Sequence, residues 1–252
     1  MNIIDNTKKV GFIIPLYKDF VYFKKSLPLI RSNYPNSDIA VMCDGTGDKD
    51  IENFCNKYNT KFFNFDHSHN NNTPGGFFRN FLKISENLNF DVVIKADPDS
   101  RVYNAFLYED FLKDHIFGTL MQSTLDRKIK YKDSFLNLIR LKFIQNGIFG
   151  IGKNIINKFK ETKYFDDDIK LRERLNFFLS KGLGSPQNYK LSSELLMSIA
   201  CHDLNIELYN HPEFYSIIYM KSLDIYFYNN ILCHKEALDN LKKFKIVHPI
   251  YE

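Results

Sequence analysis

Short apolar runs that alternate with segments of helical spacing constrain the fold of the first hundred residues. Runs rich in β-branched residues cover residues 10–16, 38–43 and 91–96, and residues 61–65 form a further short one. Uninterrupted runs of this kind predict strands buried on both faces of a parallel sheet. Between them lie segments with apolar residues at helical spacing: residues 19–32, 48–58 and 74–87.

This alternation predicts right-handed strand-helix-strand units, and therefore an α/β, Rossmann-like fold with a mostly parallel central sheet flanked by helices. Ligands of such sheets bind at the carboxyl ends of the strands. We therefore look for chemistry in the polar residues that follow the predicted strands.

The second half of the chain has a less regular pattern. A segment that mixes lysines with large apolar residues, 128–159, is typical of a solvated helix face, with a membrane-facing surface as the alternative. Gly182, Gly184 and Pro186 indicate a loop. We expect strands at 118–125, 143–151, 206–209 and 226–233, and helices at 193–202 and 236–244.

Composition excludes several classes of protein. The 252 residues are 44% hydrophobic and carry a net charge of only +4, which argues against a disordered chain and against nucleic acid as a partner. Cys43, Cys55, Cys201 and Cys233 form no Cys-x-x-Cys pair, so we expect reduced thiols. With no signal-like start and no long apolar stretch, we expect a cytoplasmic protein, at most in weak peripheral contact with the inner face of a membrane.

One acidic triplet stands out by its position. Asp97-Pro98-Asp99 directly follows the predicted strand 91–96, and two carboxylates so spaced can bind one hard divalent cation. Similar triplets at 48–50 and 166–168 do not follow a buried strand, and we read the second of these as a solvated acidic turn. A solvated turn is also the alternative for residues 97–99.

Three blocks in order resemble the GT-A glycosyltransferases. Residues 73–102, TPGGFFRNFLKISENLNFDVVIKADPDSRV, look like the segment in which an Arg-Asn pair on a helix precedes a strand ending in Asp-x-Asp. Residues 14–17 resemble the first strand and its exit, and residues 44–48 resemble the loop after the second strand. The match is closest to the large inverting family 2, and it covers residues 10–102.

The resemblance implies a single GT-A domain over 1–252, with a donor half at 10–102 and an acceptor half at 103–252. It also implies a Mn²⁺ or Mg²⁺ ion held by Asp99 and Asp97, with Asp97 alternatively on the ribose. A histidine near the chain end often completes such a metal site, which favours His248, with His234 as a rival. The nucleotide-sugar donor would then contact residues after the first strands and at the helix start: Pro15, Tyr17, Asp44, Gly76, Arg79 and Asp97.

Two of these assignments also follow from the residues themselves. Pro74-Gly75-Gly76 begins a helix whose free N–H groups favour a phosphate, and Arg79 could add a charge-assisted bond, although a plain helix start explains the glycines as well. Glu194 opens another helix and could deprotonate an acceptor hydroxyl, although the helix dipole alone explains an acid there. The family often carries Glu-Asp at this point, where this chain has Glu194-Leu195.

The resemblance, together with these residues, implies a metal-dependent glycosyltransferase. It implies transfer from a UDP-sugar to a glycan or glycolipid, with inversion and Glu194 as base, in bacterial surface polysaccharide or lipooligosaccharide synthesis. A sugar-phosphate nucleotidylyltransferase would need a glycine-rich loop after the first strand, and residues 14–18 contain no glycine. The other alternative is a nucleotide-binding or membrane-surface module without catalysis. His67 and His69 could bind zinc but lack further ligands at metal-site spacing.

Overall fold

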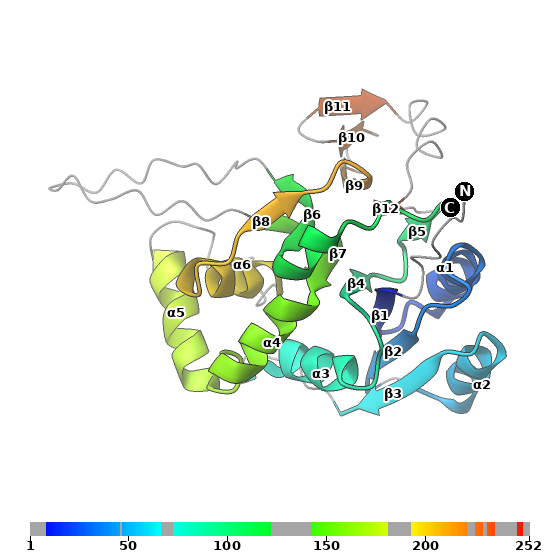
Figure 1. Ribbon diagram of the computed structural model, residues 1–252, viewed down its shortest axis with the longest axis horizontal. Coiled ribbons are helices and arrows are strands. Elements are labelled where there is room, and N and C mark those ends of the chain that lie inside the picture. The colour runs from blue at the N-terminus through cyan, green and yellow to red at the C-terminus, as the bar shows by residue number, and fades with distance from the viewer. Residues whose placement is uncertain are drawn as a thin grey trace, which may run out of the picture.

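The computed structural model describes residues 9–45, 47–66, 73–121, 143–180, 193–220, 225–228, 231–234 and 246–248. A seven-stranded sheet forms its centre, in the order β3-β2-β1-β4-β7-β6-β8 (Figure 1). Its strands are β1 (Val10–Leu16), β2 (Ile39–Asp44), β3 (Lys61–Phe65), β4 (Val92–Ala96), β6 (Ile116–Met121), β7 (Phe143–Gly152) and β8 (Leu208–Asn210).

The first four strands in chain order are mutually parallel, as the sequence predicts. β1 pairs in parallel with β2 and β4, and β2 pairs in parallel with β3. β7 is antiparallel to both of its neighbours, and β6 is parallel to β8. It follows that β1, β2, β3, β4, β6 and β8 all end at one edge of the sheet, which we call the carboxyl edge.

Helices cover both faces of the sheet. α1 (Phe20–Asn33) and α2 (Lys49–Lys57) pack on one face, in a core that includes Phe12 and Ile14. The opposite face, which includes Ile13, is covered by α3 (Gly76–Ser85), α4 (Lys153–Thr162), α5 (Asp168–Ser180) and α6 (Ser193–Asp203). Successive residues of β1 thus enter different cores, which explains why its apolar run is uninterrupted.

A smaller sheet brings the last part of the chain beside the acidic triplet. Its order is β11-β10-β9-β12-β5 (Figure 1). β5 (Arg101–Val102) begins two residues after Asp99 and pairs with β12 (Ile246–His248). The other strands are β9 (Phe214–Met220), β10 (Ile225–Tyr228) and β11 (Ile231–His234). A short 3₁₀ helix, η2, spans Asp110–Asp114.

Most elements expected in the first half are confirmed, and strands 10–16 and 61–65 have the predicted bounds. In the second half, the strand expected at 143–151 is confirmed as β7, which lies between β4 and β6 in the sheet, so the solvated helix face expected over 128–159 is wrong for residues 143–152. Residues 166 and 167 are exposed, with Asp166 in a turn, as expected, whereas Asp168 begins α5. The expected loop at 182–186 and helix at 236–244 lie outside the described residues.

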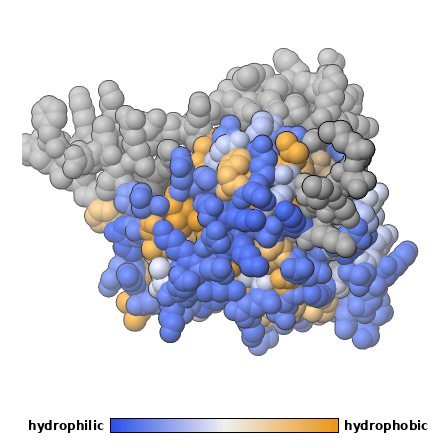
Figure 2. All heavy atoms as spheres, in the orientation of Figure 1, coloured by the Kyte–Doolittle hydropathy of each residue, from blue (hydrophilic) through white to orange (hydrophobic). Residues whose placement is uncertain are grey.

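The described part of the chain contains no helix that is both long and apolar enough to cross a membrane. On the face seen in Figure 2, the hydrophobic residues stand in small groups among hydrophilic ones. Cys43, Cys55 and Cys201 are buried free thiols, as expected, whereas the side chain of Cys233 lies outside the described part.

Candidate functional site

The acidic triplet forms a tight turn at the end of β4. The backbone N–H of Asp97 donates to the carbonyl of Gly147 on β7 (2.8 Å), and the N–H of Ser100 donates back to the carbonyl of Asp97 (2.9 Å). The Ser100 hydroxyl donates to the Gly147 carbonyl as well (3.3 Å). Asp97 and Asp99 stay partly exposed. The turn therefore presents both carboxyl-bearing residues at the carboxyl edge on a fixed backbone.

Two buried cationic side chains support this turn. The Nζ of Lys95, on β4, lies 2.5 Å from Oδ1 of Asp97, and only 2% of the lysine surface is exposed. Arg101, equally buried, donates from Nη1 to the carbonyls of Ser100 (3.0 Å) and Pro98 (3.4 Å). A buried charge is costly unless it is paired or hydrogen-bonded, so Asp97 holds Lys95 at the turn and the two carbonyls hold Arg101 through Nη1, whereas Nη2 of Arg101 has no hydrogen-bond partner among the described residues. The sequence analysis missed both.

A third carboxylate, Asp19, lies close to the pair. Partial burial raises the pKa of Asp19, and the negative charges of Asp99 and Asp97 raise it further. Asp19 precedes α1, directly after Lys18, whose backbone has the left-handed φ of 61°. Residues 17–19 therefore leave β1 in a sharp turn that carries Asp19 to the acidic triplet. The only sequence signal for Asp19 was its place after a buried strand.

The exit of β1 also carries two residues expected to bind the donor. Pro15 is half-buried within the strand and pairs with Met42, whereas the Tyr17 ring is 43% exposed beyond the strand end. The Lys18 ammonium lies 4.8 Å from the centre of the Tyr17 ring. An exposed aromatic ring at the carboxyl edge is a suitable surface for stacking a nucleotide base.

The loop after β2 is built for a close turn. Asp44 ends the strand half-buried, and Gly45 has a φ of 75°, which favours glycine. The Asn64 side chain accepts from the N–H of Gly47 and donates to its carbonyl, both at 3.3 Å. Asp48 caps α2 by accepting from the N–H of Ile51 (2.9 Å). Asp48 thus serves the start of α2, and Asp44 stays the residue of this loop that is predicted to contact the donor.

The start of α3 is joined to α5 by an ion pair. Arg79 Nη2 lies 2.8 Å from Oδ2 of Asp168, and Nη1 donates to Oδ1 (3.1 Å) and to the carbonyl of Phe165 (2.6 Å). The N–H of Gly75 donates to the same carboxylate (2.9 Å), and Gly76 is buried as the first residue of α3. The expectation that 166–168 is an idle solvated turn is therefore wrong for Asp168, because Arg79 recruits it.

The first turn of helix α6 points toward the carboxyl edge of the sheet, where the acidic triplet lies. Its last residue is followed by a short connection to β8, and β8 runs parallel to β4 through β6 and β7. The helix packs on β7, and eleven residues of helix span about 16 Å, so its first turn reaches back toward the carboxyl edge. Glu194 lies in that first turn, and its side chain is outside the described part. Leu195, 1% exposed, is a core residue, which explains the absence of an acid there.

The two histidine candidates occupy different strands of the smaller sheet. Val247 pairs with Arg101 and Ile246 with Val102, so the antiparallel register carries His248 toward the Asp99 side of β5. His234 ends β11, which is separated from β12 by β10 and β9, about 14 Å at the usual strand spacing. The backbone therefore favours His248 over His234. The side chains of both, and all of His67 and His69, lie outside the described residues.

The donor set suits a hard divalent cation. Carboxylate oxygens such as those of Asp97 and Asp99 are preferred ligands of Mg²⁺ and Mn²⁺. Among the described side chains, no group of three or more His, Cys, Asp or Glu gathers closely enough to hold a metal alone. Mg²⁺ in nucleotide sites is commonly bound by one or two carboxylates together with the phosphates of the substrate.

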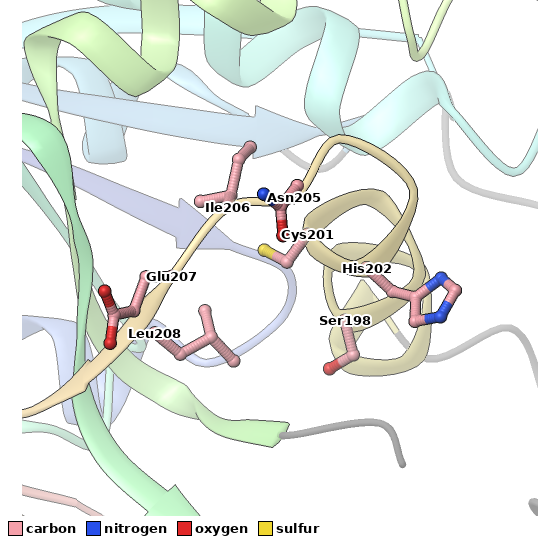
Figure 3. A pocket seen from close by; sticks show the side chains of 7 residues that line it. All are labelled: Ser198, Cys201, His202, Asn205, Ile206, Glu207 and Leu208. Carbon is pink, nitrogen blue, oxygen red and sulfur yellow. The ribbon is translucent and has the colours of Figure 1, made fainter. Parts of the chain in front are cut away.

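Two cavities lie elsewhere. One of about 500 Å³, open to solvent, lies between the end of α6 and the segment leading into β8 (Figure 3). In that view Ser198 and Cys201 project from the helix, with Ile206 on the connecting segment and Leu208 at the start of β8. Another, of about 360 Å³, is lined by residues at the starts of β2 and β3 and by residues of α2. Both are at the edge opposite Asp97 and Asp99, so neither belongs to the acidic site.

Comparison with known proteins gives similarity in structure alone. No protein-family model matches the chain, and no curated protein does. A crystal structure of the galactosyltransferase LgtC in complex with donor and acceptor sugar analogs is similar with a TM-score of 0.54 and 12% identity, covering 96% of this chain and 87% of that one. The glycosyltransferase GlyE of Streptococcus pneumoniae TIGR4 gives 0.51 and 10%, covering 98% of this chain and 55% of that one.

The chain has the GT-A fold. These likenesses confirm the predicted α/β architecture, whereas the narrower resemblance to family 2 gains no support from them. A cytidylyltransferase from Leptospira borgpetersenii is also similar, with a TM-score of 0.45 and 10% identity, too low to carry an argument. The function of this GT-A chain must be inferred from its own residues.

Proposed function

We propose that the protein is a glycosyltransferase that moves a sugar from a nucleoside diphosphate donor, UDP in the first instance, to a glycan or glycolipid acceptor. One observation carries the proposal: Asp97 and Asp99 stand partly exposed on a hydrogen-bonded turn at the carboxyl edge of a GT-A sheet, near enough to Asp19 for their charges to raise its pKa. Ligands of such sheets bind at this edge, and the negative charge of these carboxylates, which Lys95 offsets only in part, favours a cation there. A nucleotide diphosphate with Mn²⁺ or Mg²⁺ supplies that cation.

The position of each residue suggests which part of the donor or metal it would contact. Asp99 and Asp97 would hold the metal, with His248 approaching from β12. Tyr17 and Pro15 would lie against the nucleoside, Asp44 would accept from the base, and Gly76 would start the helix that faces the diphosphate. When bound, a divalent ion stabilises the negative charge that develops on the leaving diphosphate.

The candidate residue on the acceptor side is Glu194. Glu194 opens α6 toward the carboxyl edge, where a carboxylate could take the proton of an acceptor hydroxyl. Inversion at the anomeric carbon and an acceptor in surface polysaccharide or lipooligosaccharide synthesis come from the sequence resemblance, and a cytoplasmic location comes from the lack of a signal-like start and of a long apolar stretch in the sequence; all stay part of the proposal.

Nucleotide binding with and without metal tests the proposal. Calorimetry of UDP with the protein in Mn²⁺ should give tight binding that EDTA removes, and Asp99→Ala should abolish the metal-dependent part while the thermal transition is kept. Asp50→Ala is the matched control, since Asp50 is the exposed acid of another Asp-x-Asp triplet and should leave binding unchanged. Equal UDP affinity in Mn²⁺ and in EDTA would contradict the metal role.

Hydrolysis or transfer separates an enzyme from a binding module of the same fold. Purified protein in Mn²⁺ should slowly hydrolyse one of a panel of UDP- and GDP-sugars, detected as released nucleotide. A protein that binds UDP with Mn²⁺ but turns over none of these donors, even with glycan acceptors added, would favour the non-catalytic alternative.

A further inference from the structure

Lys95 is an unusual residue for a central strand. It lies on β4 with β1 and β7 on either side, and 2% of its surface is exposed. Its ammonium lies 5.8 Å from the centre of the Phe149 ring and 2.5 Å from Oδ1 of Asp97. Removing a buried ammonium from water is costly, and a single close carboxylate offsets that cost. The acidic site is thus built around a resident positive charge.

The charges at the site set what can bind there. Asp19, Asp97 and Asp99 contribute negative charge, and Lys95 offsets part of it at Asp97. An incoming divalent ion meets the carboxylates together with the repulsion of the ammonium. A nucleoside diphosphate, by contrast, is attracted by both cations.

We propose that Lys95 weakens the binding of a free divalent cation to the acidic pair, so that tight metal binding requires a nucleoside diphosphate to bind with it. This inference rests on the proposed function and deepens it, since it states how strongly the binding of the metal depends on the binding of the donor. Coupling between two ligands is reciprocal, so Lys95 also strengthens the effect of the metal on nucleotide binding.

Mn²⁺ alone is the first probe. Electron paramagnetic resonance of free Mn²⁺ gives its affinity for the wild-type protein, for Lys95→Gln, which keeps a donor to Asp97 but removes the charge, and for Lys95→Met, which removes both. We expect both variants to bind Mn²⁺ about tenfold more tightly, which corresponds to about 1.4 kcal/mol. Lys95→Arg keeps the charge and should bind Mn²⁺ as the wild type does.

Mn²⁺ with UDP is the second probe. In the wild type UDP should raise the Mn²⁺ affinity by a larger factor than in Lys95→Gln or Lys95→Met. Lys113→Gln is the matched control, because Lys113 pairs with Asp91 at 3.7 Å near the start of β4, at the other end of that strand from Asp97. It should leave both affinities unchanged.

The outcomes separate this inference from the proposed function. Unchanged or weaker Mn²⁺ binding by Lys95→Gln and Lys95→Met, with circular dichroism melts showing folded protein, would overturn it and leave Lys95 a role in holding Asp97. Loss of folding in both variants would also overturn it, by assigning Lys95 to the fold alone. Failure of the wild type to bind UDP with Mn²⁺ would instead contradict the proposed function.

Discussion

Arg79 and Asp168 form a two-bond ion pair that ties the start of α3 to the start of α5. The guanidinium and carboxylate meet at 2.8 and 3.1 Å, and the carboxylate accepts a third bond from the N–H of Gly75. Planar pairs of this kind are stronger and more directional than single ion pairs. The pair therefore fixes the glycine-rich helix start near the carboxyl edge, whatever else Arg79 does there.

Asp168→Ala should destabilise the fold. The variant removes the partner of Arg79 and the acceptor for Gly75, and hydrogen bonds to charged groups are each worth about 1.5–3 kcal/mol. We expect a loss of about 2 kcal/mol in the free energy of unfolding, measured by urea denaturation. Asp166→Ala, at an exposed acid two residues away, is the control and should change stability by less than about 0.5 kcal/mol. An equal loss in both variants would contradict a specific role for the pair.

Arg79 is also our candidate for the diphosphate, and its partner allows a sharper test. Arg79→Ala should weaken UDP binding about ten- to hundredfold and leave uridine binding unchanged, since a charge-assisted bond is worth about 1.5–3 kcal/mol. Asp168→Asn should keep or increase UDP affinity, because the guanidinium loses a competing anion. If UDP and uridine lose affinity equally in Arg79→Ala, the residue is purely structural.

The first half of the fold could be predicted because its signals are local. The apolar run at 10–16 predicts a buried strand from seven adjacent residues, and β1 has those bounds. Asp97 and Asp99 could be chosen among several acidic triplets by the same means, since they follow such a run. Their place at the carboxyl edge then follows from the parallel sheet.

What the sequence could not show depends on contacts between distant residues. Asp168 lies 89 residues from Arg79, and nothing in the pattern of 166–168 indicates that pairing. In the sequence Lys95 is only one polar residue in an apolar strand. Its ion pair with Asp97 depends on the turn that follows the strand, and the sequence pattern does not show the shape of that turn. Position 195 is similar: whether a leucine there is a lost acid or a core residue depends on how α6 packs on β7.

A network around Asp203 predicts how stability depends on pH. Burial raises the pKa of Asp203, but hydrogen bonds from Arg174, Tyr164 and His202 and the charge of Arg174 together hold it below its ordinary value. Tyr164 Oη donates at 2.7 Å and Arg174 Nε at 2.8 Å. A carboxyl whose pKa is lower in the folded state stabilises the fold above its unfolded pKa, about 3.9, and this contribution disappears as pH falls through the folded value.

Asp203→Asn should therefore lower the free energy of unfolding at pH 7 by about 1–3 kcal/mol, since it weakens bonds to a charged group. The difference from the wild type should stay constant down to about pH 5 and shrink below about pH 4. Urea denaturation at pH 7, 5, 4 and 3 measures it. A difference of the same size at pH 3 and pH 7 would show that the asparagine acts through packing rather than through charge.

The catalytic base is the riskiest assignment and has the most direct test. The topology brings the first turn of α6 toward the carboxyl edge. The family often carries Glu-Asp at this point, and here the second position is the buried core residue Leu195, so Glu194 is the candidate base. Glu194→Gln keeps the size and the polarity of the side chain and removes the base. Because general base catalysis contributes about 10² to 10⁴ in rate, kcat should fall by that factor while the affinity for UDP with Mn²⁺ stays nearly unchanged.

NMR of the product should show inversion at the anomeric carbon if a single displacement assisted by Glu194 operates. A retained configuration would remove the need for a base on the acceptor side, and unimpaired turnover in Glu194→Gln would show that this acid stabilises the helix start through the dipole of α6 instead.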